Sequence, residues 1–471
     1  MNKYILLIFF LFFFCNSFSQ KVVINGKAPG AEGKTLDVIT YSDQVTYLER
    51  KVASTFIDDK GNFTLQFNAD NTFMSFITIE YHKAELYIEP NSTYEVKIQR
   101  VNYDSIYEII NPFLDQQYLK MEMLNSKETE LNTVIGKFNS AFNNFIVSYG
   151  DTLYVHPSKK KIELFLKKIE YEFLGFNNEY FKAYCKYKLA SLYMFAHLKG
   201  NDELIEKYFY NQPVLYDNVE YMDLFNNLFS NYILSGSRKI KYKDLETTIN
   251  YKANYPALLD SLGKDTILRN EVFRELVLLK NMNDLLGVKD FSKENIIYIL
   301  KAFIQKTKFE QHKIIAQNII SAATKLNIAT QAPLFSLKDL NGRIISLNDF
   351  KGKYIYLFFF TSDCLPCETE LKLINDYEKK YGNKIEFIGI SLDRKKETFM
   401  DFLLKNNFSW HALYFNGDKE LIEKYNAKSL PLFVFIDENG DILNYPARMP
   451  SGNIETVFQI FTQNAPNKIK R

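Results

Sequence analysis

The spacing of hydrophobic and polar positions divides the chain into three stretches. From residue 20 to residue 104 the two kinds alternate in short runs such as Phe63-Thr64-Leu65-Gln66-Phe67, separated by turn-forming sequences such as Pro29-Gly30. A period of two, bounded by Gly, Asn and Pro, is typical of antiparallel strands. We therefore expect residues 20–104 to form a small β-rich domain of the β-sandwich type.

Residues 105–327 follow a helical period instead. Hydrophobic residues recur three and four positions apart, as in Ile162, Phe165, Leu166 and Ile169, while Gly and Pro become scarce. This spacing places the apolar side chains on one face of a helix, so the stretch is predicted to be an all-α region. Breaks between its helices are expected near His156-Pro157, Gly200-Asn201, Gln212-Pro213, Gly236 and Gly287.

Residues 328–471 alternate between strand-like and helix-like patterns, which predicts an α/β domain with a mixed sheet. The continuous apolar run Tyr354–Phe360 is typical of a buried central strand. The other elements are expected at Glu368–Tyr381 (helix), Ile385–Ser391 (strand), Lys395–Lys405 (helix), Leu432–Ile436 (strand), Asp441–Tyr445 (strand) and Ile454–Thr462 (helix).

Residues 1–19 have the features of a signal peptide. Lys3 gives a positive start, and Ile5–Phe14 is an apolar run too short to cross a bilayer of about 30 Å. Ser17-Phe18-Ser19 then offers small residues for cleavage before Gln20. We therefore expect an exported protein, located in the periplasm or the cell envelope.

Cys15 raises a lipoprotein anchor as an alternative to cleavage. A lipoprotein signal requires a small residue directly before the cysteine, and Phe14 is bulky. Cleavage is therefore favoured over a lipid anchor or an uncleaved membrane anchor. No later apolar run reaches the length of about 18 residues that a membrane-spanning helix requires.

Composition and cysteine usage narrow the function. The 471 residues suffice for two or three domains, and 46% hydrophobic with 24% charged residues is ordinary for a globular protein. A formal net charge of +2 gives no basis for nucleic-acid binding. After cleavage Cys185, Cys364 and Cys367 would remain, too few for a disulfide framework. They predict one redox pair and, in Cys185, a buried structural thiol.

Cys364-Leu365-Pro366-Cys367 lies between the predicted central strand and the helix that follows it. Residues three apart share one helix face, so the two sulfurs can join with little backbone movement. Unpaired amides at a helix start favour the thiolate of Cys364, and Pro366 is tolerated in a first turn. We predict that Cys364 is the exposed nucleophile and that Cys367 is the shielded cysteine that resolves a mixed disulfide.

Ser429-Leu430-Pro431 directly precedes the predicted strand Leu432–Ile436. A proline here is compatible with a cis peptide bond, although the sequence leaves the isomer open.

Several segments of the last stretch resemble thioredoxin-like proteins of the TlpA and ResA type. They are Ala332–Gly342, Ser346–Lys353, the two cysteines with their spacing, Phe387–Asp393 and Pro431–Gly440. The resemblance covers residues 330–462. It implies a thioredoxin fold and a cis Pro431 beside the active sulfurs, so that Leu430 and Pro431 are the residues expected to bind the substrate. It also implies extracytoplasmic thiol–disulfide exchange, usually as a reductant. A β-rich module and a helical spacer before such a domain are similar to the layout of exported bacterial members.

The resemblance also implies that Glu370 lies near the disulfide, where a carboxylate would hold or relay a proton. An exposed helix glutamate is the alternative. Three positions depart from the family pattern. Asp363 replaces the usual Trp, and it either disfavours the thiolate through its charge or caps the helix. Lys372 replaces a helix proline, and Phe358 replaces the buried acid beneath the pair.

Two other functions stay open. Thr361 stands three residues before Cys364, as in peroxiredoxins, which indicates a thiol-dependent peroxidase, but Leu357 occupies the position of the proline in that motif. Alternatively, the first two domains bind a partner, and the thioredoxin-like domain is a vestigial part of a non-catalytic scaffold. No metal site is expected, because the sequence has no second CxxC and no closely spaced pair of histidines.

The expected reaction uses only the two cysteines. Reduced Cys364 would attack an oxidised protein client, and Cys367 would release that client in reduced form. A membrane electron donor would then restore the dithiol. No dissociable cofactor is required, since the dithiol itself carries two electrons. The client stays undefined, and a homodimer formed through the helical region stays open.

Overall fold

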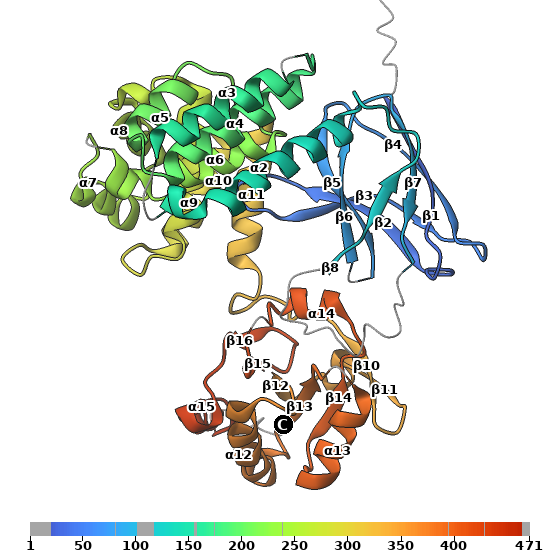
Figure 1. The fold of residues 1–471 in the computed structure, drawn as a ribbon. Coiled ribbons are helices and arrows are strands. Elements are labelled where there is room, and N and C mark those ends of the chain that lie inside the picture. The colour runs from blue at the N-terminus through green and yellow to red at the C-terminus, as the bar shows by residue number, and fades with distance from the viewer. Residues whose placement is uncertain are drawn as a thin grey trace, which may run out of the picture.

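The computed structural model describes residues 20–463, apart from residues 81, 101–116, 155–157, 174, 238, 394 and 428. The predicted signal peptide, its cleavage site and Cys15 lie outside these residues. Within them the chain is multidomain, with a β-rich module, a helical region and an α/β domain in the predicted order (Figure 1). No helix of this described part is long and apolar enough to span a membrane.

Two packed sheets form the N-terminal module. Its strands are β1 (Lys21–Lys27), β2 (Thr35–Tyr41), β3 (Glu49–Phe56), β4 (Asn62–Asn68), β5 (Phe73–Ile79), β6 (His82–Ile88), β7 (Thr93–Ile98), β8 (Gln117–Tyr118) and β9 (Met121–Met123). One sheet has the order β4-β1-β7-β9 and the other the order β3-β2-β5-β6-β8. Alternate side chains, such as Val22 and Ile24 of β1, are buried in the apolar core between the sheets, which confirms the expected sandwich.

The module extends past the boundary predicted at residue 104. β8 pairs with β6, and β9 pairs with β7, so residues 117–123 belong to the two sheets and not to the helical region. The first described helix after them begins at Leu131. The sequence did not show these strands, because two or three residues are too few to display a period of two.

The central region is built of helices, and its apolar stripes are buried as predicted. Ile162, Leu166 and Ile169 of α3 are buried in a core shared with its neighbours. The helices are α2 (Leu131–Tyr154), α3 (Lys159–Phe173), α4 (Glu179–Phe195), α5 (Asn201–Tyr208), α6 (Val219–Leu228), α7 (Tyr242–Glu246), α8 (Tyr255–Gly263), α9 (Glu271–Leu285), α10 (Lys293–Lys306) and α11 (Glu310–Thr324), with short η1 (Tyr232–Gly236), η2 (Thr247–Tyr251) and η3 (Thr266–Leu268).

Hydrogen bonds join the β-rich module to the helices. The Tyr47 hydroxyl donates to Asp223 at 3.0 Å, and the Asn318 amide donates to Asp43 at 2.7 Å.

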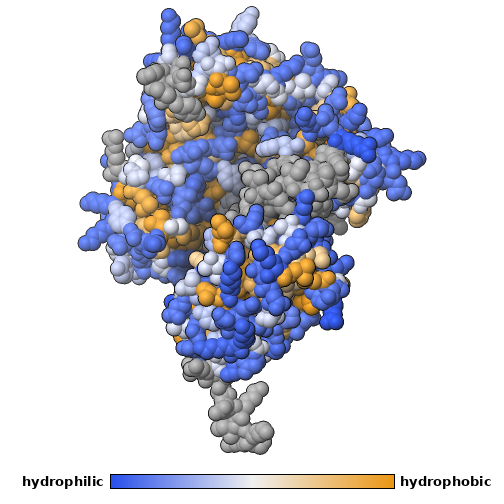
Figure 2. Space-filling model, turned by 60° about the horizontal axis from the view of Figure 1, so that its bottom comes forward, coloured by the Kyte–Doolittle hydropathy of each residue, from blue (hydrophilic) through white to orange (hydrophobic). Residues whose placement is uncertain are grey.

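On the face shown in Figure 2, apolar side chains form separate patches interrupted by polar ones.

The α/β domain is a mixed sheet with helices on both faces. Its elements are β10 (Ser336–Asp339), β11 (Ile344–Ser346), η4 (Leu347–Phe350), β12 (Tyr354–Phe360), α12 (Leu365–Tyr381), β13 (Ile385–Ser391), α13 (Lys396–Asn406), β14 (His411–Tyr414), α14 (Lys419–Lys424), β15 (Leu432–Ile436), β16 (Ile442–Asn444), η5 (Pro450–Gly452) and α15 (Glu455–Gln463). The strand order is β11-β10-β14-β13-β12-β15-β16. β12, β13 and β14 are parallel, whereas β15 runs antiparallel to β12.

The position of β12 explains its unbroken apolar sequence. Leu357 and Phe359 enter a core on one face of the sheet, which α14 helps to form through Leu421. Tyr356, Phe358 and Phe360 enter the core on the other face, with side chains of α12, α13 and α15. A strand covered on both faces has no position for a polar residue. These layers confirm the thioredoxin-like fold expected for this part of the chain.

Candidate active site

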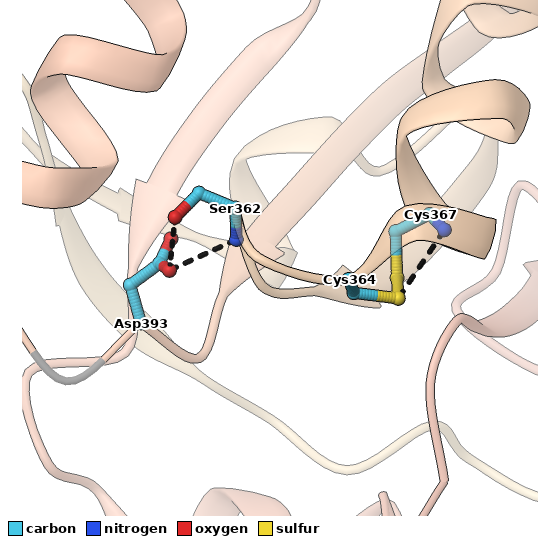
Figure 3. Close-up of a disulfide and its surroundings, with 4 residues drawn as sticks. All are labelled: Ser362, Cys364, Cys367 and Asp393. Carbon is cyan, nitrogen blue, oxygen red and sulfur yellow. Dashed lines mark hydrogen bonds between the residues drawn. A yellow bond between two sulfur atoms is a disulfide. The ribbon is translucent and has the colours of Figure 1, made fainter.

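The connection from β12 to α12 carries both cysteines. β12 ends at Phe360, and a three-residue turn leads to Cys364, which is the N-cap of α12. Its Sγ accepts a hydrogen bond from the backbone N–H of Cys367 at 3.2 Å (Figure 3). The sulfur therefore takes the place of a capping side chain, facing the first-turn amides. The alternative that Asp363 caps the helix is wrong, and this residue is exposed in the turn.

The two cysteines differ in access. They form a disulfide with their Cα atoms 5.2 Å apart. The Cys367 side chain is fully buried in the core beside Leu371, whereas Cys364 is half-buried at the edge of the same core. An approaching thiol or disulfide therefore meets the sulfur of Cys364 first.

Leu430 and Pro431 lie at the same end of the sheet. Leu432 at the start of β15 pairs with Phe359 near the end of β12, so Pro431 lies beside the point where the chain leaves for Cys364. The Leu430–Pro431 peptide bond is cis. Leu430 is half-buried and packs against the cores on both faces of the sheet.

Glu370 is buried, so the alternative of an exposed helix glutamate is wrong. It follows Cys367 by three residues on α12 and is 6% exposed. Its two carboxylate oxygens accept hydrogen bonds from Ser451 in η5, one from the backbone N–H at 2.9 Å and one from the hydroxyl at 2.5 Å. Burial, reinforced by the Glu370 carboxylate, raises the pKa of Tyr356 on the adjacent strand. No motif connects Glu370 with Ser451, which lies 81 residues further along the chain.

Aromatic rings share the core that contains Cys367. Phe358 is fully buried, and its ring meets Trp410 edge to face with centroids 4.9 Å apart. Gly389 of β13 leaves room for both rings, because a Cβ there would come within 2.5 Å of each. The position on β12 where related proteins have a buried acid therefore holds Phe358, which is part of a packed aromatic cluster.

Asp393 is a second buried carboxylate at this end of the sheet. Its Oδ1 accepts hydrogen bonds from Ser362 in the turn before Cys364 (Figure 3). Its Oδ2 accepts a hydrogen bond from Ser391 at the end of β13. No sequence motif marks Asp393 as part of the site. One available signal was its place just after β13, because the carboxyl ends of parallel strands meet at one edge of the sheet.

Cys185 lies on α4, in the helical region and apart from the cysteine pair. Burial, with a smaller effect of the Glu220 carboxylate, raises the pKa of its thiol.

The described residues contain no cluster of three His, Cys, Asp or Glu side chains that could hold a metal ion.

Known proteins share this α/β domain. A family model described as the AhpC/TSA family matches residues 328–444. The thiol-disulfide oxidoreductase ResA of Bacillus cereus is 32% identical over 128 residues, which make up 27% of this chain and 73% of that protein. The chain belongs to the ResA-type thiol-disulfide oxidoreductases. ResA of Bacillus anthracis is 30% identical over the same length.

A solved structure, the thioredoxin domain of a thiol-disulfide oxidoreductase from Bacteroides vulgatus, is 25% identical with a TM-score of 0.27. It covers 28% of this chain and 97% of that one. Membership of the ResA-type family confirms the expected enzyme class, a thioredoxin-like oxidoreductase whose substrates are thiols and disulfides.

Proposed function

We propose that this ResA-type oxidoreductase reduces disulfide bonds of protein clients outside the cytosol through Cys364 and Cys367. The observation that carries the proposal is the unequal burial of two bonded sulfurs at one helix start. The accessible sulfur has amides to stabilise its thiolate, and the buried sulfur is protected from clients but remains next to its partner. This arrangement suits exchange better than a permanent structural bond.

The reaction proceeds by two thiolate attacks. The Cys364 thiolate attacks one sulfur of the client disulfide, forms a mixed disulfide and releases the other client sulfur, which takes up a proton. The Cys367 thiolate then attacks Sγ of Cys364, which forms the Cys364–Cys367 disulfide and releases the second client sulfur. Two electrons and two protons pass to the client, and a membrane thiol donor returns them.

Glu370, Leu430 and Pro431 serve the same cycle. Glu370 lies one helical turn beyond Cys367, and its carboxylate accepts hydrogen bonds from Ser451. In the proposed cycle this carboxylate takes the proton of Cys367 during the second attack. Leu430 and Pro431 form the edge along which a client segment lies while it is joined to Cys364.

A trapping experiment tests the mechanism. Reduced Cys367→Ser protein is mixed with envelope extract and with an oxidised model client, and covalent adducts are separated without reductant. Cys367→Ser is expected to accumulate adducts that dithiothreitol releases, because the second attack is blocked. Cys364→Ser is the matched control and is expected to form none. Absence of adducts in the first variant would contradict the proposal.

Location is tested separately. Export is supported by the signal-like sequence of residues 1–19 and by the ResA resemblance. Cell fractionation is expected to find the chain in the envelope fraction, with its new N-terminus at Gln20.

A peroxidase is the second candidate, favoured by the match to the AhpC/TSA family. In that reaction the Cys364 thiolate attacks one oxygen of hydrogen peroxide, the O–O bond breaks, and hydroxide leaves and is protonated to water, so that Cys364 becomes a sulfenic acid. Cys367 then attacks the sulfenic sulfur and forms the disulfide with loss of a second water. The two functions differ in which oxidant Cys364 prefers. Faster oxidation of reduced protein by hydrogen peroxide than by a disulfide at equal concentration would favour the peroxidase.

A further inference from the structure

One buried carboxylate ties the turn before Cys364 to the neighbouring strand. Asp393 is 5% exposed, and its Oδ1 accepts hydrogen bonds from the backbone N–H of Ser362 at 2.9 Å and from its hydroxyl at 2.6 Å (Figure 3). Its Oδ2 accepts from the hydroxyl of Ser391 at 2.6 Å, and its own N–H donates to that Oγ at 3.0 Å. Both carboxylate oxygens are therefore engaged, one toward the turn and one toward β13.

Ser362 is the middle residue of this turn and lies two positions before the nucleophile. The turn has backbone support at its ends, from the hydrogen bond of Leu392 N–H to Phe360 and from that of Cys364 N–H to Thr361. Ser362 lies between these two points, and both its backbone N–H and its side-chain hydroxyl donate hydrogen bonds to Asp393. This turn is the segment through which the chain enters α12 at Cys364.

We infer that Asp393 is a positioning residue for Cys364, which by holding Ser362 keeps the sulfur over the amides at the start of α12. The inference rests on the proposed use of Cys364 as nucleophile. In the reduced protein those amides stabilise the thiolate, so a fixed turn provides more thiolate at neutral pH than a loose one.

The charge and the hydrogen bonds of Asp393 act on the thiolate in opposite directions. A nearby negative charge disfavours the thiolate, whereas the fastening of Ser362 favours it. Asp393→Ala removes both effects, so a slower thiol in this variant cannot come from the loss of charge. Asp393→Asn removes the charge but keeps an oxygen that can accept both hydrogen bonds from Ser362.

Other ionisable groups around the turn stay unchanged in these variants. They include Asp363 in the turn itself, and Glu368 and Glu370 on α12. On β14, burial and the nearby Asp393 carboxylate raise the pKa of Tyr414 to about 12. Burial is the larger cause and remains in the Asp393 variants, so this phenol is neutral near neutral pH in all of them.

The test is the pH profile of Cys364 alkylation by iodoacetamide, followed by mass spectrometry on full-length reduced protein carrying Cys367→Ser. The expected order of profile midpoints, from highest to lowest, is Asp393→Ala, Ser362→Ala and the parent, with Asp393→Asn at or below the parent. At pH near neutral, Asp393→Ala is expected to react at least about threefold more slowly, the change that a half-unit shift gives. The midpoint of Ser362→Ala is expected to lie between those of Asp393→Ala and the parent, because the backbone N–H of residue 362 still donates to Asp393.

Asp437 provides the matched control. It follows β15, which is antiparallel to β12, so it lies at the opposite edge of the sheet and accepts hydrogen bonds from the N–H groups of Asn439 and Asp441 in its own turn. Asp437→Asn is expected to leave the profile unchanged.

Three outcomes would overturn the inference. They are Asp393→Ala reacting as fast as the parent or faster, Asp393→Asn being as slow as Asp393→Ala, and the Asp437 control shifting equally. If Asp393→Ala does not fold by circular dichroism, Ser362→Ala decides, and an unshifted profile there overturns the inference. A parent whose Cys364 reacts no faster than Cys185 would instead contradict the proposed function.

Discussion

The Sγ atom of Cys364 lies 3.2 Å from the backbone nitrogen of Cys367, while the Cys367 side chain has no exposed surface. The same helix start thus offers one sulfur to solvent and to stabilising amides, and encloses the other. This difference in environment, more than the spacing of the two residues, determines which sulfur reacts first.

The first prediction concerns the order of thiol reactivity. In fully reduced protein near neutral pH, Cys364 is expected to be alkylated at least about tenfold faster than Cys367 or Cys185, as is typical of an accessible thiol near a helix start. Cys367 is slow because it is buried, and Cys185 because burial raises the pKa of its thiol. Peptide mapping by mass spectrometry after short exposure to iodoacetamide measures all three. Earlier labelling of Cys367 than of Cys364 would refute the proposed roles.

The second prediction concerns Glu370. Replacing it with Ala leaves the N–H and hydroxyl of Ser451 without their acceptor, which is expected to lower the free energy of unfolding by about 1–3 kcal/mol. Trp410 is the only tryptophan and lies in the α/β domain, so its fluorescence during urea unfolding reports on this domain.

Glu368 is the control on the same helix. It is partly exposed and paired with Lys372, so Glu368→Ala is expected to cost less than about 0.5 kcal/mol. Similar urea midpoints for the Glu368 and Glu370 variants would show that the Ser451 contacts do not stabilise the domain. A slower release of client from the mixed disulfide in Glu370→Gln, with unchanged formation of that adduct, would support the proton-accepting role.

The third prediction concerns Gly389, which lies against the rings of Phe358 and Trp410. A Cβ at position 389 would come within 2.5 Å of both Phe358 and Trp410, so Gly389→Ala forces two packed rings to move. The expected loss is about 1–3 kcal/mol of unfolding free energy, with a shifted emission of Trp410 in the folded state. Gly452→Ala in the same domain is the control, because its nearest neighbour lies 4.0 Å away. An unchanged emission spectrum in Gly389→Ala would contradict this packing.

The sequence was sufficient where a local pattern decides the structure. The strands Tyr354–Phe360, Ile385–Ser391 and Leu432–Ile436 have the ends predicted for them, because a strand covered on both faces is apolar throughout. The cysteine pair was found for the same reason, since its spacing and its place between a strand and a helix are both local.

Features that depend on distant partners were not predictable in this way. The Glu370 carboxylate is bonded to Ser451, and residue preferences favour Asp363 as the cap of α12, whereas the structure has Cys364 there. The strands β8 and β9 exist because longer strands far back in the chain pair with them. Each of these features depends on a contact between residues that neither the hydrophobic periodicity nor a sequence motif connects.

His82 links the stability of the β-rich module to pH. Its side chain is 3% exposed at the start of β6. Burial lowers the pKa of His82 from its ordinary value of 6.5, against smaller opposing effects of the Ile79 backbone and the Glu80 carboxylate. The unfolded chain therefore binds a proton at this position at a higher pH than the folded module does.

The fourth prediction follows from that difference. As the pH falls through the ordinary histidine range, the free energy of unfolding is expected to fall by up to about 1.4 kcal/mol per pH unit, until folded His82 is itself protonated. His82→Leu has no proton to bind, so its loss of stability between about pH 7.5 and about pH 5 is expected to be smaller than that of the parent. Urea unfolding followed by far-ultraviolet circular dichroism measures both losses. His197→Gln, at an exposed position, is the control and should lose as much as the parent. Equal losses in the parent and in His82→Leu would show that this histidine does not couple folding to pH.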